Sequence, residues 1–200
     1  MPESLTRRTF LAGCATVGAT VGMPTLPAWA ETPHRKLVVG RRTIEVLGKA
    51  AEVYGLTSAG GSHGLVLEPD ERFSVALEST LSEETSIHWH GMTPRPELDG
   101  VSETGYVAPL QAGETRAFDF LARPGTHWMH SHYGLQKQGL LTAPLIVRDA
   151  SDLDAQEVTL MLHDFSFRDP SEIFAGLTGQ SGMGHGGMAG MDHGLSLIHI

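Results

Sequence analysis

The chain has 200 residues, a length that fits one domain and the beginning of another. Its 24 Gly and 11 Pro residues are many for a helical protein and typical of a turn-rich β protein. The formal net charge of −9 disfavours nucleic acid as a partner, because contact with phosphates requires a basic surface.

Residues 1–30 have the features of a twin-arginine export signal. The pair Arg7-Arg8 is followed by an apolar, small-residue run over 11–21 and by Ala-Trp-Ala at 28–30, which fits a cleavage site. The apolar run is too short and too rich in glycine to be a permanent membrane anchor. We therefore expect a mature chain that the twin-arginine export machinery delivers to the periplasm or the exterior.

The single cysteine, Cys14, lies within this signal. A mature chain without a thiol can form no disulfide and has no cysteine nucleophile. It also cannot hold a blue-copper centre by itself, since that centre requires a Cys thiolate.

Residues 31–150 are predicted to form the first folded domain. Apolar and polar residues alternate in short runs, as in Phe73, Val75 and Leu77, and turn residues separate the runs. Strands are expected at 36–47, 85–90, 115–121, 126–133 and 140–148, and also within 64–81, where a turn at 68–70 precedes the alternating set. Short strands at this spacing favour an all-β sandwich or a Greek-key barrel.

A second unit is predicted to begin in residues 151–179. Residues 157–167 form an apolar run that we interpret as a strand. Asp169, Pro170 and Glu172 then have the N-cap, N1 and N3 pattern of a helix start. The unit therefore contains one expected strand and one short helix.

Residues 180–200 are predicted to be a flexible segment rich in Gly, Met and His, because they lack the apolar content of a core. The last six residues, 195–200, do not continue the pattern. We expect the chain to be the N-terminal part of a longer protein with a truncated end.

Two pairs of histidines carry the chemistry: His88 with His90, and His130 with His132. Residues two apart on a strand share a face and lie roughly 6.6 Å apart. Two such pairs facing each other would place four imidazoles around one small volume. Copper has the highest intrinsic affinity of the divalent metals for such ligands, and four histidines without a carboxylate or thiolate would be unusual for zinc. The alternative is that the rings are surface or satisfied core residues.

The neighbours of the second histidine pair can also be assigned to a strand face from their parity, that is, from whether their numbers are odd or even. Trp128 has the same parity as His130 and is expected to line the site, whereas His127 has the opposite parity.

His-Trp-His-Gly at 88–91 and Trp-Met-His-Ser-His at 128–132 resemble the first domain of the multicopper oxidases. The likeness covers most of residues 36–175 and includes Pro-Gly-Thr at 124–126 and Ala-Pro-Leu-Ile-Val at 143–147. It is greatest to the laccase-like, bacterial copper-resistance branch, whose members often carry Met/His-rich inserts similar to 183–193.

The resemblance implies a cupredoxin-like Greek-key domain followed by the beginning of a second cupredoxin domain. It also implies that His88 binds a type 2 copper and that His90, His130 and His132 bind the type 3 pair of a trinuclear cluster. The family's other motifs, which include the His-Cys-His of the type 1 copper, lie in a C-terminal region that this sequence does not contain.

Asp99 occupies the position of a family acid near the trinuclear site and is implied to help supply protons during O2 reduction. A carboxylate linked to metal-bound water can relay protons. The alternative is a turn aspartate, which the Asp-Gly dipeptide alone predicts.

The function implied by the resemblance is an oxidase that takes electrons from cuprous ion, ferrous ion or a phenolic compound and reduces O2 to water, with a role in copper tolerance. Thioethers prefer Cu(I), so the Met/His-rich segment is a possible Cu(I) site; the alternative is a flexible linker. Its candidate ligands are Met183, His185, Met188, Met191 and His193. A non-enzymatic periplasmic protein that binds or sequesters copper, and an envelope scaffold without copper, are the competing functions. The oligomeric state is not predicted.

Overall fold

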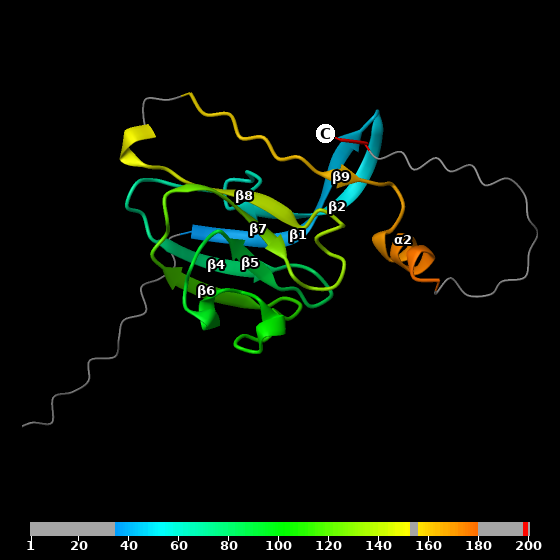
Figure 1. Ribbon diagram of the computed structural model, residues 1–200, viewed down its shortest axis with the longest axis horizontal. Helices are drawn as coiled ribbons and strands as arrows, with labels where there is room; N and C mark the ends of the chain where they lie inside the picture. The colour runs from blue at the N-terminus through cyan, green and yellow to red at the C-terminus, as the bar shows by residue number, and fades with distance from the viewer. Residues whose placement is uncertain (1–34, 153–155, 180–197, 200) are drawn as a thin grey trace, which may run out of the picture. The chain divides into compact units, whose positions relative to one another are not determined.

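The computed structural model describes residues 35–152, 156–179 and 198–199. The predicted export signal, residues 1–30, and the predicted Cu(I) ligands between 183 and 193 lie outside these residues. Figure 1 labels the elements. The strands are β1 (Arg35–Val46), β2 (Lys49–Ser58), β3 (Leu65–Leu67), β4 (Phe73–Ser79), β5 (Ile87–His90), β6 (Thr115–Phe120), β7 (Gly125–Ser131), β8 (Thr142–Val147), β9 (Asp164–Phe165) and β10 (Ile198–His199). The helices are η1 (Pro96–Leu98), η2 (Ser102–Thr104), η3 (Ala150–Asp152) and α2 (Pro170–Leu177).

Eight of these strands form two four-stranded sheets, with the orders β2-β1-β4-β6 and β3-β8-β7-β5. The chain passes from one sheet to the other several times, so each sheet contains one parallel pair, β1 with β4 and β3 with β8. The other neighbours are antiparallel. The predicted all-β sandwich is therefore confirmed.

The core lies between the two sheets and is built by alternation along the strands. One sheet contributes Phe73 and Val75, and the other contributes Trp89, Met129 and Leu145, all of them fully buried. The Trp89 ring lies 4.6 Å from Phe73 and 5.0 Å from the ring of Phe118 on β6, measured between centroids. A strand with period-two side chains can bury one face in this way and leave the other face free for a site.

The hairpin of β1 and β2 is longer than the neighbouring strands, and its turn end projects past them in Figure 1. This end packs in a second, smaller apolar cluster that consists of Val46, Val53, Leu140 and Phe165. The same two strands therefore take part in two separate cores.

The strand predictions need correction at two places. Strand β2 was not expected. The turn predicted at 68–70 is confirmed, because it separates β3 from β4 and its residue Asp70 has a φ of 62°. The predicted strand 157–167 is wrong except at β9, because no neighbouring strand among the described residues pairs with 157–163.

The predicted helix start is confirmed. Asp169 caps α2, and its side chain accepts a hydrogen bond from the backbone N–H of Ser171 at 2.7 Å. Within the part of the chain that the structure describes, no helix is long and apolar enough to cross a membrane.

Candidate metal centre

Strands β5 and β7 bring the two histidine pairs together. They pair antiparallel with His88 opposite His130 and His90 opposite Trp128. Ile87 and Trp89 point into the core, so alternation turns the imidazoles of β5 to the opposite face of the sheet. The predicted parity of the first pair is therefore confirmed.

The four imidazoles are close neighbours. The ring centroid of His88 lies 5.5 Å from His90, 5.4 Å from His130 and 5.2 Å from His132. The rings of His130 and His132 are 4.8 Å apart, and His90 Nδ1 lies 3.3 Å from His130 Nε2.

One nitrogen each of His88, His90 and His130 lies within 4.8 Å of the other two, which is a spacing that could hold a metal ion. His132 is outside this triple, although its ring adjoins two of the members. The four side chains therefore share one region rather than surround a single point.

The outer nitrogens of three rings face oxygen atoms of the protein. Nδ1 of His88 lies 3.1 Å from the backbone oxygen of Asp99, and Nδ1 of His130 lies 3.2 Å from that of Ser131. Nδ1 of His132 lies 3.6 Å from Glu103 Oε2. An Nδ1–H directed at an oxygen leaves the Nε2 lone pair for a metal. His90 differs, because its Nδ1 faces His130.

Asp99 is both a turn residue and a neighbour of the site. It is the C-cap residue that follows η1 and precedes Gly100, whose φ is 78°. Its carboxylate Oδ1 lies 3.4 Å from His88 Nδ1. A Cβ on Gly100 would lie 1.8 Å from the backbone oxygen of Ile87, so the Asp-Gly turn must pass directly against β5. Asp99 therefore lies in a turn, and this turn places its carboxylate beside His88.

Burial keeps the imidazole rings of His130 and His132 neutral at pH 7. It lowers the pKa of His130 to about 4 and also lowers the pKa of His132, on which the neighbouring Glu103 has the opposite effect. A neutral imidazole is the form that binds a metal. These two rings therefore offer nitrogen donors in the form that binds a metal at neutral pH.

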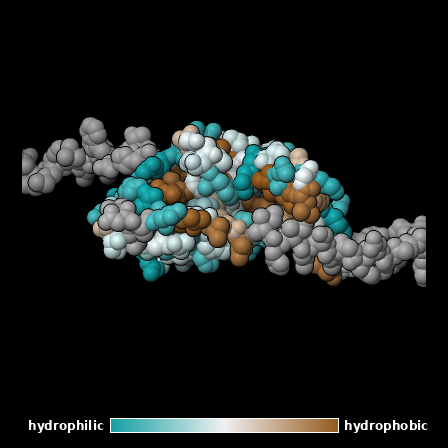
Figure 2. All heavy atoms as spheres, turned by 90° about the horizontal axis from the view of Figure 1, so that it is seen from above, coloured by the Kyte–Doolittle hydropathy of each residue, from teal (hydrophilic) through white to brown (hydrophobic). Residues whose placement is uncertain are grey.

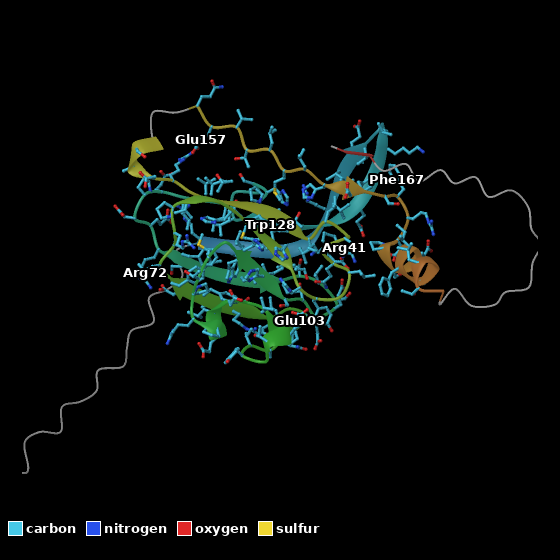
Figure 3. The ribbon with its side chains drawn as sticks, in the orientation of Figure 1. Arg41, Arg72, Glu103, Trp128, Glu157 and Phe167 are labelled. Atoms are coloured by element: carbon cyan, nitrogen blue, oxygen red, sulfur yellow. The ribbon has the colours of Figure 1, made fainter. Side chains whose placement is uncertain are left out.

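Trp128 and His127 lie as their parity predicts. The Trp128 ring stacks on His130 with 4.1 Å between centroids, and Figure 3 labels this tryptophan together with Glu103. His127 Nε2 instead lies 3.0 Å from the backbone oxygen of Arg123. The His127 ring passes over Gly91, where an added Cβ would lie 2.3 Å from its Nδ1.

The donor set fits copper. Four imidazoles on one sheet, three of them with an outer nitrogen that faces an oxygen, are ligands that copper accepts, and no thiolate or carboxylate is needed. Sequence reasoning missed Glu103, which lies on η2 and belongs to no motif. Only the folding of the β5–β6 connection brings it to His132.

The family model described as multicopper oxidase matches residues 39–152. The chain belongs to the multicopper oxidase family. This multicopper oxidase chain is similar to a copper resistance protein A homolog and a copper resistance protein A, both of Pseudomonas syringae pv. tomato. The identities are 32% and 30% over 200 residues, and each match covers 90% of this chain.

Among solved structures, the chain is similar to a multicopper oxidase of Pseudomonas thermotolerans, with 29% identity and a TM-score of 0.51. That match covers 57% of this chain and 29% of the solved chain. The cupredoxin-like fold expected for the family is thus confirmed. The two curated matches cover 33% and 32% of the relatives, so this multicopper oxidase chain spans about a third of their length.

Proposed function

We propose that this chain is the N-terminal part of an exported multicopper oxidase that reduces O2 to water at a trinuclear copper cluster. The observation that carries the proposal is the triple of His88, His90 and His130, whose nitrogens lie within 4.8 Å of one another. Membership of the family supports the oxidase chemistry.

In the proposed arrangement His88 binds the type 2 copper, and His90, His130 and His132 bind the type 3 pair. The chemistry that bound copper supplies is electron transfer to O2, which takes up four electrons and four protons to give two water molecules. The protein orients the imidazoles through the oxygens of Asp99, Ser131 and Glu103.

Asp99 is the proposed source of protons. Its Oδ1 lies 3.4 Å from His88 Nδ1 and the side chain is only half-buried, so water can reach the carboxylate beside the histidines. This role requires the turn at Gly100, which keeps the carboxylate against β5.

The proposed domain plan has a twin-arginine signal at 1–30, a first cupredoxin domain at 31–150, the start of a second at 151–179 and a Met/His-rich end at 180–200. Support comes from the large apolar side chains that stay exposed after residue 151, since a second core would cover them. They include Val158, Leu160, Leu162, Phe174 and Leu177. Apolar areas among polar ones are visible on the face shown in Figure 2.

The full-length protein would draw electrons from cuprous ion, ferrous ion or a phenolic compound through a type 1 copper in its C-terminal region. Copper tolerance in the periplasm is the proposed role, and similarity to copper resistance proteins supports it. We expect the replacement of Met183, Met188 and Met191 by Ser in the full-length protein to lower cuprous-ion oxidation more than phenol oxidation. Equal effects on both substrates would reject this site.

The histidine assignment is tested by titrating the chain with copper(II). We expect His88→Ala and His130→Ala each to weaken binding by more than about 100-fold, because loss of an outer-shell partner alone costs 10- to 100-fold. His127→Phe is the matched control and should bind like the wild type. Equal affinity in all variants would refute the site.

The oxidase assignment is tested on the full-length protein by O2 consumption with a cuprous or phenolic donor. Tight copper binding without O2 consumption would favour the alternative function, a protein that sequesters copper.

A further inference from the structure

A group of buried polar side chains lies behind the histidines. We call Thr85, Ser86, Ser131 and Gln136 the buried polar cluster; each is at most 5% exposed. Thr85 and Ser86 directly precede β5, Ser131 is the last residue of β7, and Gln136 follows in the next turn. Buried polar groups in an apolar sandwich are costly unless they are hydrogen-bonded.

Gln136 is the residue that connects this cluster. Its Oε1 accepts hydrogen bonds from the hydroxyls of Thr85 and Ser131, both at 2.8 Å, and its Nε2 donates to the backbone oxygen of Glu84 at 2.8 Å. One amide therefore links the chain just before the first histidine pair to the residue between His130 and His132.

Backbone bonds extend this link to the site. The N–H of His132 donates to the backbone oxygen of Ser86 at 2.9 Å, and the hydroxyl of Ser86 donates to the backbone oxygen of Gly100. The cluster thus touches both histidine strands and the turn that carries Asp99.

Strand β5 needs such a link because it is short and lies at the edge of its sheet. It has four residues, and β7 is its neighbour on one side only. A displacement of β5 along β7 would separate His88 from His130, which lie opposite each other. The three short hydrogen bonds of Gln136 oppose that displacement, since moving β5 would leave buried donors and acceptors unpaired.

We propose that Gln136 is a positioning residue, whose side-chain amide sets the spacing between the two histidine pairs and so determines how tightly they hold copper. The inference rests on the proposed copper site at these four histidines. Gln136 itself does not face the imidazole nitrogens and acts through Thr85, Ser131 and the backbone.

The test compares Gln136→Met with Gln138→Met in copper(II) titrations of the chain. Methionine keeps the length of the side chain and removes all three hydrogen bonds. We expect Gln136→Met to bind copper(II) at least about fivefold more weakly; because Gln136 acts through its neighbours, the loss should stay below the roughly 100-fold seen when a direct partner of a ligand is removed. Gln138 is exposed in the same turn, so its variant should stay within about twofold of the wild type.

A loss of stability alone must be separated from a loss of positioning. Val75→Ala removes core volume from β4 in the other sheet, and it should destabilise the fold while it keeps the wild-type affinity and copper(II) EPR spectrum. We expect Gln136→Met to change the EPR spectrum at saturating copper, because the ligand geometry changes. A wild-type spectrum and affinity in folded Gln136→Met would overturn the proposal.

If Gln136→Met does not fold, Thr85→Val tests the positioning role of Gln136 in its place. Valine has the shape of threonine and removes one hydrogen bond to Gln136, so affinity should fall several-fold; an unchanged affinity would refute the inference. Where both single variants fold, the fold-loss of copper(II) affinity in the double variant should be smaller than the product of the two single fold-losses. The outcomes stay distinct: weak copper binding by the wild type contradicts the proposed function, whereas tight wild-type binding with unaffected variants contradicts only the role of Gln136.

Discussion

The replacement Trp89→Phe tests how the core supports the site. Trp89 lies between His88 and His90 in sequence but is fully buried on the opposite face of β5. Its indole N–H donates to the backbone oxygen of Leu98 at 3.1 Å. Leu98 ends η1 and directly precedes Asp99, so the indole holds the proposed proton donor's turn against the strand.

The expected cost follows from two losses. An unpaired, partly buried carbonyl at Leu98 costs about 1–3 kcal/mol. The smaller ring also weakens the edge contact with Phe118, now 5.0 Å between centroids, and such aromatic pairs contribute about 0.5–1.5 kcal/mol. We therefore expect Trp89→Phe to lower the free energy of unfolding by about 2–4 kcal/mol.

Urea denaturation measures this cost, and Trp128→Phe is the control. The Trp128 ring stacks on His130 and is half-buried, and phenylalanine can keep that stacking, so the control should lose less than about 1 kcal/mol. Copper(II) affinity of Trp89→Phe should also fall several-fold as the turn loosens. A cost below about 1 kcal/mol, or equal costs in both variants, would refute the reasoning.

Three further predictions concern single positions. Gly100→Ala should cost at least about 3 kcal/mol in urea unfolding, because its φ is 78° and its Cβ would meet a backbone oxygen of β5, whereas Gly113→Ala, with φ 73° and open space, should cost about 1 kcal/mol; equal costs would contradict this. Burial lowers the pKa of His63 from 6.5 to about 4. Between pH 4 and pH 6.5, the unfolded chain therefore binds a proton that the folded chain excludes. The stability from neutral His63 is therefore complete above pH 6.5 and is lost by up to about 3 kcal/mol as the pH falls to 4; unfolding of His63→Gln should show a shallower pH dependence, and the same slope would speak against it. Glu103→Gln should weaken copper(II) binding several-fold at low salt and little at 1 M salt, since the carboxylate is exposed and 3.6 Å from His132; an effect that persists in 1 M salt would exclude a charge interaction.

The histidine site was accessible to sequence reasoning because it depends on local rules. Parity on a strand determines which face His88, His90 and His130 occupy, and two His-x-His pairs limit the ways in which they can meet. The turn at Asp99 was predicted from a dipeptide, and its position beside His88 from the resemblance.

The missing pieces depend on an unusual hairpin turn and on contacts between distant segments. Strand β2 was overlooked because the hairpin turn has Leu47 at a φ of 51° before Gly48, where Asn or Asp would have been the usual signal. The run 157–167 has the composition of a strand, but a strand also needs a neighbour to pair with. Glu103 and Gln136 reach the site only through the paths of their loops, for which no residue pattern exists.

The double membership of the β1–β2 hairpin has a consequence for local unfolding. Leu37 and Leu56 near its open end belong to the large core, whereas Val46 and Val53 near its turn belong to the four-residue cluster. The small cluster has far fewer buried side chains than the large core, so the hairpin should open from the turn inward while the sandwich stays folded. Its backbone amides should then exchange with deuterium in a gradient, fastest beside Leu47 and slowest beside Leu37.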